Sequence, residues 1–302
     1  MAATATQVKT QSDKETDLAP ARRPRRRLRA DRIRLIVLGA VLLPIALAWI
    51  YPFIWMLSAS VKDNSEIFRG LNPFTSVVRL DNYVRAWSQA HVGQYFLNTV
   101  LVTAGSIVIT LIAVSTIGYV LGRYQFPGKR IIIGLFAAAV FLPEGYTIIP
   151  IFDLLKGLHL SSSLWGLTLA ESGGAHVIAI LLFTAYFRQL PDELEESARV
   201  DGAGFLRTFL LIYLPLARPV IATVVILQFM HAWNDFLLPL VMTLSRPELR
   251  TLSVGIYAFQ GDNFTDWSGL AAAATISLIP IVVLFLFLQR YFVEGIAGAV
   301  KQ

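Results

Sequence analysis

Six stretches of the sequence are apolar over the length that an α-helix needs to cross a bilayer. They cover residues 35–57, 97–121, 131–152, 165–187, 219–242 and 269–290. A hydrocarbon core of about 30 Å requires about 20 apolar residues in a helix, and backbone polar groups in lipid must be paired within the segment. Only 15% of the residues are charged, against about 25% in a soluble domain. The sequence therefore predicts an all-α polytopic membrane protein with six transmembrane helices.

A basic run precedes the first apolar stretch. Its arginines are Arg22, Arg23, Arg25, Arg26, Arg27, Arg29, Arg32 and Arg34. The apolar stretch is too long for a signal peptide and lacks a clear cleavage site, so we interpret it as a transmembrane helix that follows a disordered basic tail, residues 1–32. With the N-terminus in the cytoplasm, inner segments carry 19 Lys and Arg and outer segments carry 7. The positive-inside rule therefore predicts that both termini are cytoplasmic, and it assigns the basic charge to membrane lipid rather than to nucleic acid.

The connection between the fourth and fifth spans, residues 188–218, is long enough to form helices of its own. Pro191 can start a helix, and the acidic residues that follow suit the positive end of its dipole. Asp201-Gly202 is a turn signal, and a second amphipathic segment covers 204–213. The sequence predicts a helix–turn–helix on the cytoplasmic face. The alternative is an interfacial amphipathic loop without a partner.

The spacing within this loop resembles the EAA loop of ABC-importer permease subunits. The matching residues are Glu196, Ser197, Ala198, Asp201, Gly202, Ala203, Leu214 and Pro215. Ser197 stands where that family usually has alanine. The resemblance implies a type I ABC importer permease fold over residues 33–302, with this loop as a coupling helix that docks on a separate ATPase. It also implies that Glu196 contacts the ATPase and that Gly202 permits the turn.

Further stretches resemble the carbohydrate-uptake, maltose-transporter-type branch of that family. They are Leu71-Asn72-Pro73 with Asp81-Asn82-Tyr83, Asn98-Thr99, Trp233-Asn234-Asp235-Phe236 with Pro239-Leu240, and the C-terminal segment 293–301. This resemblance implies a sugar or oligosaccharide substrate and a bacterial inner (cytoplasmic) membrane location. It implies three partners: a second permease subunit, a dimeric ABC ATPase and an extracytoplasmic solute-binding protein. ATP and Mg would bind the ATPase, and this chain would be neither an enzyme nor a cofactor carrier.

Polar and aromatic residues within the spans are candidates for a substrate pathway, because polar groups in membrane helices usually face a cavity. The candidates are Glu144, Tyr146, His231, Trp233, Asn234 and Asp235. Sugars need hydrogen bonds and aromatic faces, which these side chains offer. The alternative is that Tyr146 belongs to the interfacial aromatic belt and that Asn234 and Asp235 only bond neighbouring helices.

No motif for nucleotide or metal chemistry is found in the sequence. Gly122 to Arg130 superficially suggests a P-loop, but its spacing is one residue off and Arg130 replaces the required Ser or Thr. The four His are scattered and no HExxH motif is present, so neither a metal nor a catalytic site is expected. Two alternatives stay open: an ABC permease for another solute, and a gradient-driven secondary transporter with Glu144, His231 or Asp235 as relays.

Overall fold

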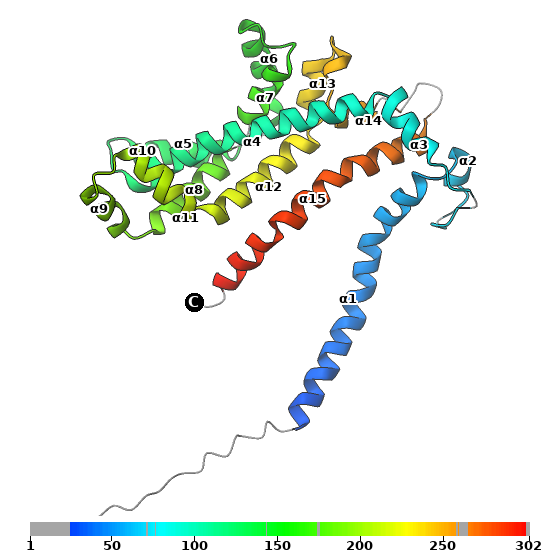
Figure 1. The fold of residues 1–302 in the computed structure, drawn as a ribbon, viewed down its shortest axis with the longest axis horizontal. Coiled ribbons are helices and arrows are strands. Elements are labelled where there is room, and N and C mark those ends of the chain that lie inside the picture. Colours follow the sequence, from blue (N-terminus) through cyan, green and yellow to red (C-terminus); the bar gives the residue numbers. More distant parts are fainter. Residues whose placement is uncertain are drawn as a thin grey trace, which may run out of the picture. The chain divides into compact units, whose positions relative to one another are not determined.

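The computed structural model describes residues 25–70, 72–75, 77–142, 144–173, 176–257, 259 and 265–299. For residues 25–32, 89, 144 and 290–299 it describes the backbone alone. The chain divides into two compact units, residues 1–53 and 54–302. In the part of the chain that is described, the secondary-structure elements are all helices (Figure 1).

Helix α1, Arg25–Ala59, begins in the first unit. From Ile33 to Ile50 its side chains are exposed throughout, and most of them are apolar, as a helix surrounded by lipid requires. Residues 25–32, which the sequence analysis included in the disordered basic tail, form the first turns of α1. Residues 1–24 of that tail lie outside the described residues.

The second unit contains a series of helices of very different length. Before the predicted loop these are α2 (Asn64–Ile67), α3 (Asp81–Val84), the π-helical η1 (Arg85–Gln89), α4 (Val92–Arg123), α5 (Lys129–Ala139), the 3-10 helix η2 (Glu144–Thr147), α6 (Ile148–Gly157), α7 (Leu164–Gly173) and α8 (Val177–Gln189). The loop holds α9 (Glu193–Val200), α10 (Phe205–Thr208), the π-helical η3 (Phe209–Tyr213) and α11 (Leu214–Leu216). The last are α12 (Arg218–Asn234), α13 (Leu237–Thr243), the 3-10 helix η4 (Pro247–Leu249), α14 (Leu252–Tyr257) and α15 (Trp267–Ala299).

Three of the described helical segments are long and apolar enough to cross a membrane alone: Ile33–Ala59, Val92–Arg123 and Trp267–Gln289. Two bent pairs, α7 with α8 and Phe205–Leu216 with α12, can each supply one more span by length and composition. The span predicted at 131–152 is not one continuous helix, since α5 ends at Ala139 and α6 begins at Ile148. The all-α, polytopic fold class is confirmed.

Helix α4 is the centre of the second unit and packs against α7, α8 and α12 (Figure 1). Two glycines four residues apart face α8. A Cβ built on Gly118 would lie 2.4 Å from the Cβ of Phe183, and one built on Gly122 would lie 3.0 Å from the Cβ of Phe187. Small residues at this spacing let two membrane helices bring their backbones together. The sequence 118–122 therefore fixes the distance between α4 and α8.

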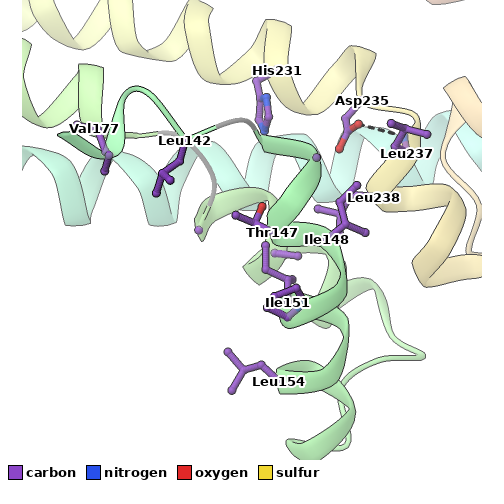
Figure 2. Close-up of a pocket in the computed structure, with 15 residues that line it drawn as sticks. Leu142, Thr147, Ile148, Ile151, Leu154, Val177, His231, Asp235, Leu237 and Leu238 are labelled. Carbon is purple, nitrogen blue, oxygen red and sulfur yellow. Dashed lines mark hydrogen bonds between the residues drawn. The ribbon is translucent and has the colours of Figure 1, made fainter. Parts of the chain in front are cut away.

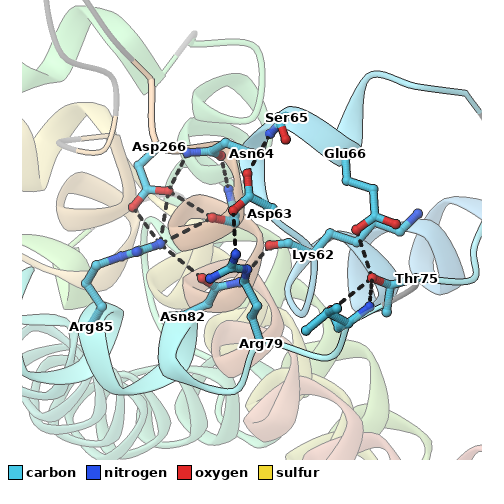
Figure 3. Close-up of polar contacts among 12 residues, drawn as sticks. Lys62, Asp63, Asn64, Ser65, Glu66, Thr75, Arg79, Asn82, Arg85 and Asp266 are labelled. Atoms are coloured by element: carbon cyan, nitrogen blue, oxygen red, sulfur yellow. Dashed lines mark hydrogen bonds and ion pairs between the residues drawn. The ribbon is translucent and has the colours of Figure 1, made fainter.

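A polar cluster joins the segment after α1 to the start of α15 (Figure 3). A guanidinium nitrogen of Arg85 lies 3.3 Å from a carboxylate oxygen of Asp266. The amide of Asn64 donates to Asp266 Oδ1 at 3.2 Å and accepts the backbone N–H of Ser268 at 2.8 Å. These contacts span about 200 positions of sequence, and they hold the loop that follows α1 against the first turn of α15.

We predict that Gly118→Ala destabilises the protein by about 1–3 kcal/mol, because the added methyl group overlaps the backbone and Cβ of α8. Gly134→Ala on α5 is the matched control, since a Cβ there meets nothing within 4 Å. The control should be neutral or slightly stabilising. Thermal unfolding in detergent measures both variants, and equal midpoints for the two would contradict the packing argument.

Candidate functional site

The loop that follows α8 folds as the predicted helix–turn–helix. Helix α9 starts after Asp192 and has three acidic residues in its first turn. Gly202 follows Asp201, the C-cap residue of α9, and lies in the left-handed region with φ +74°. Its N–H donates to the carbonyl of Arg199 at 3.0 Å, and the N–H of Ala203 donates to the carbonyl of Ala198 at 2.9 Å. This is the Schellman arrangement, which ends a helix and needs glycine at the left-handed position.

The second half of the loop packs on the C-terminal end of α4 through aromatic rings. Tyr119 of α4 is fully buried, and its ring centroid lies 4.9 Å from that of Tyr213 and 5.1 Å from that of Phe209. Phe187 at the end of α8 completes the cluster at 5.8 Å from Tyr119. Such ring pairs add about 0.5–1.5 kcal/mol each beyond the area that they bury. The aromatic cluster therefore fixes η3 against α4 and α8.

Arg123, the last residue of α4, ties the first half of the loop to the same place. It donates to Asp192 Oδ1 at 2.6 Å and to the carbonyl of Leu190 at 2.9 Å, and its Nε lies 3.5 Å from Glu195 Oε2. The side chain is only 5% exposed. Sequence reasoning counted Arg123 as a topology charge alone and missed this role. Because its acidic partners follow about 70 residues later, no local pattern could identify the pairing.

The residues predicted for coupling divide between the surface and the interior. Glu196, Ser197, Asp201, Gly202 and Pro215 are exposed, Ala203 and Leu214 are partly buried, and Ala198 is buried. The hydroxyl of Ser197 donates to the carbonyl of Glu193 at 2.7 Å, so it is satisfied within α9. The exposed surface at this position therefore resembles the one that alanine would give.

Exposed apolar side chains lie on the same loop as the exposed acids. They are Val200, Phe205, Leu206, Leu210 and Leu211, and Val200 is 88% exposed. An apolar patch rimmed by polar residues is typical of a contact with protein or membrane. The loop thus offers both an acidic and an apolar part to a partner.

A cavity of about 590 Å³ lies between the α5–α6 region, α7 and the junction of α12 with α13 (Figure 2). Its lining is mostly apolar, with residues such as Leu142, Ile148, Ile151, Leu154 and Leu238. His231 and Asp235 line it from the end of α12. The structure therefore brings two of the six predicted pathway residues together at one cavity.

Both polar side chains of this wall are held in place. His231 Nε2 lies 3.5 Å from Oε2 of Glu171, a fully buried carboxylate on α7. Asp235 Oδ1 accepts the backbone N–H of Leu237 at 3.2 Å, which caps α13 after the chain leaves α12 (Figure 2). These groups can exchange hydrogen bonds with a hydroxyl-bearing solute, and the apolar remainder of the lining can contact its carbon faces.

Trp233 and Asn234 do not line this cavity. Trp233 is buried, stacks on Phe229 at 5.1 Å and donates its indole N–H to the carbonyl of Ser277 at 3.2 Å. Asn234 is exposed, and its amide donates to the carbonyl of Met230 at 2.8 Å. In the conformation described, Trp233 packs α12 against α15, and Asn234 bonds its own helix rather than a neighbouring one.

The remaining two candidates lie on η2. Tyr146 is 80% exposed and is not part of the cavity lining. The side chain of Glu144 lies outside the described residues. Among the residues that the structure describes, no three His, Asp or Glu side chains gather closely enough to hold a metal ion. The segment that superficially suggests a P-loop forms the end of α4, a turn and the start of α5.

Comparison with known proteins decides the family. The family model for the binding-protein-dependent transport system inner membrane component matches residues 114–298. The chain belongs to this family. It is therefore a permease subunit and not an enzyme, a multi-pass inner membrane protein that works within a transport complex. The resemblance found in the sequence is confirmed, and the gradient-driven alternative loses its support.

Individual permeases are similar over most of their length. The probable ABC transporter permease protein YurM of Bacillus subtilis is 35% identical over 83% of this chain and 83% of its own. The diacetylchitobiose uptake system permease protein NgcG of Streptomyces coelicolor is 32% identical over 92% of this chain and 89% of its own. A chain of a bacterial ABC transporter involved in import of the acidic polysaccharide alginate superimposes with a TM-score of 0.73 at 25% identity, covering 87% of this chain and 98% of that one.

We predict that Gly202→Ala loosens the end of α9, because an L side chain in the left-handed region costs about 1–2 kcal/mol. Gly204→Ala is the control: its φ is −75°, and a Cβ there meets nothing within 4 Å. Amide hydrogen exchange over residues 193–203 should become faster in the first variant alone. The same exchange rates in both variants would show that the glycine cap does not hold this turn.

Proposed function

We propose that the chain forms half of the translocation pathway of an ATP-driven importer for an oligosaccharide. The observation that carries this proposal is the similarity, over about nine-tenths of the chain, to a permease named for uptake of diacetylchitobiose. The superposition on a transporter for alginate supports the same substrate class. ATP and Mg²⁺ bind a separate ATPase dimer, a second permease subunit completes the pathway, and an extracytoplasmic binding protein delivers the sugar.

The α9–α11 loop is the surface that we assign to the ATPase. Glu196 and Asp201 give it exposed negative charge, and Val200 and Leu206 give it exposed apolar area. Burial of apolar side chains with a charged rim is how protein interfaces combine affinity with specificity. With this loop in the cytoplasm, the charge distribution of the connections supports a cytoplasmic location of both termini.

The cavity beside α12 is the part of the pathway that we assign to this chain. His231 and Asp235 are its polar contacts for sugar hydroxyls, and Glu171 behind His231 orients the imidazole. Trp233 acts indirectly, since its indole N–H donates to the carbonyl of Ser277 in α15 and so holds the end of α12. Glu144, Tyr146 and Asn234 remain candidates for contact with sugar in another conformation of the transporter.

Transport then follows from alternating access between two global states. The ATPase dimer binds the α9–α11 loop differently when it is open and when it is closed, and a ligand shifts a two-state equilibrium only through such a difference in affinity. The permease passes this bias from the loop to the helices around the cavity. The chain itself needs no nucleotide site for this work.

We predict that Glu196→Lys lowers the amount of ATPase that co-purifies with the transporter by at least about tenfold, because it replaces an attraction with a repulsion in the interface. Glu193→Lys is the matched control, as it reverses an exposed acid in the same first turn of α9. Affinity purification of the complex and densitometry of the ATPase band measure both. Full recovery of the ATPase with Glu196→Lys would contradict the docking assignment.

We predict that Asp235→Asn, which removes the charge from a hydrogen bond to the sugar, and His231→Ala, which removes a hydrogen bond, each reduce sugar uptake by about tenfold, while ATPase recovery stays normal. Asn234→Ala is the control, because Asn234 is exposed at the same end of α12 but does not line the cavity. Uptake of neutral chito-oligosaccharides and of acidic alginate oligosaccharides by cells is compared.

Each result of this uptake experiment bears on a separate part of the proposal. Uptake of neither sugar class by the wild-type transporter would remove the carbohydrate assignment. Normal uptake by Asp235→Asn and His231→Ala would remove the cavity from the pathway. A loss of uptake with Asn234→Ala alone would move the sugar contact from the cavity to the exposed face of α12.

A further inference from the structure

We propose that Arg123 is a positioning residue that makes the α4–α8 pair follow the α9–α11 loop when the transporter changes conformation. This inference rests on the proposed function, which assigns the loop to the ATPase. It concerns a different step, because Arg123 does not belong to the docking surface: its side chain is 5% exposed. The role is to carry a displacement from the loop into the helices.

One guanidinium group contacts the end of α8, the start of α9 and η3. It donates to the carbonyls of Phe187 and Leu190, where α8 ends, at 3.5 and 2.9 Å. It pairs with Asp192, the residue before α9, at 2.6 Å. It also lies over the ring of Tyr213 in η3, 5.3 Å from the centroid. The end of α4 is thereby joined to both ends of the loop.

Packing alone holds α9 weakly. Ala198 is the one buried residue of its eight, and most of the others are exposed. By contrast, η3 is fixed through Phe209 and Tyr213 in the aromatic cluster. The contacts of Arg123 are therefore the main polar connection between α9 and the spans among the described residues.

The two carboxylates around Arg123 differ in how strongly they connect α9 to α4. The side chain of Asp192 is 86% exposed, and that of Glu195 is 12% exposed. Water and salt screen an exposed ion pair far more than a buried one. Glu195 also pairs with Arg199 at 2.8 Å, so its carboxylate is held from both sides. We therefore assign the connection chiefly to the Arg123–Glu195 pair.

A positive charge alone could not make these contacts, because they depend on the shape of the guanidinium group. The guanidinium is a planar fork whose nitrogens reach a carboxylate and a carbonyl at the same time, whereas a lysine ammonium is a single point. Here Nη1 serves the carbonyl of Leu190 and Nη2 serves the carboxylate of Asp192. Arg123→Lys should keep the fold and lose part of the coupling.

The absence of cysteine from the sequence makes a conformational test possible. Thr147→Cys places one thiol in the lining of the cavity. In the assembled transporter with its ATPase, the rate of maleimide labelling of this thiol is measured with and without ATP and vanadate. ATP hydrolysis is measured on the same preparation. The ratio of the ATP-dependent change in labelling rate to the rate of ATP hydrolysis reports how strongly the cavity is coupled to the ATPase. This ratio can be measured without knowing the sugar.

We expect Arg123→Gln to keep ATP hydrolysis and to reduce the ATP-dependent change in labelling rate by at least about tenfold, the effect of losing a hydrogen bond to a charged group. Glu195→Gln and Arg123→Lys should give intermediate losses. Arg188→Gln is the matched control: it removes an exposed cation from the end of α8 and should leave the labelling response unchanged.

Each other outcome is decisive. A normal labelling response in Arg123→Gln and Glu195→Gln overturns the proposal. Loss of bound ATPase in parallel with the response, in Arg123→Lys as well as Arg123→Gln, also overturns it, because Arg123 would then only support the docking surface. If no ATPase accompanies the wild-type chain, the proposed function fails, and this inference fails with it. A defect in Arg123→Gln with ATPase bound supports the proposal.

Discussion

The close approach of α4 and α8 at Gly118 and Gly122 is the constraint on which the rest of the structure depends. Lipid provides no hydrophobic force between two apolar helices, so their association relies on packing and hydrogen bonds. Without side chains at these two positions, the backbone of α4 touches that of α8. Tyr119 and Arg123, on the same stretch of α4, therefore lie where α8 ends and the loop begins.

This geometry makes the loop and the spans parts of one structure. A guanidinium that is 5% exposed needs ionic or hydrogen-bonding partners, because a buried charge without them is strongly destabilising. Among the residues that the structure describes, the partners of Arg123 lie between Phe187 and Tyr213. The loop therefore folds as it does partly to satisfy a charge that α4 carries. A displacement of the loop must either move α4 or break these contacts.

The sequence was sufficient where structure depends on local patterns. The apolar stretches 35–57, 97–121 and 269–290 each became one continuous helix, α1, α4 and α15, and the turn at Gly202 formed because glycine suits its left-handed backbone conformation. It was insufficient where a contact depends on residues that lie far apart in the sequence. The partners of Arg123 are far away in sequence. Trp233 was a candidate for the cavity, and its contact with α15 depends on Ser277, which is 44 residues away. The division of 131–152 into α5, η2 and α6 was likewise not predicted from the sequence.

The polar wall of the cavity arises where a span is interrupted. Helix α12 ends at Asn234, and the backbone groups freed there must be paired within the protein because lipid offers no partner. Asp235 meets this need: its N–H donates to the carbonyl of His231 at 3.0 Å, its carboxylate caps Leu237, and its carbonyl accepts the hydroxyl of Ser253. A carboxylate that would be unfavourable in a continuous membrane helix is thus stabilised by the break itself. The same interruption that shortens the span places a hydrogen-bonding group at the cavity, so architecture and solute contact have one origin.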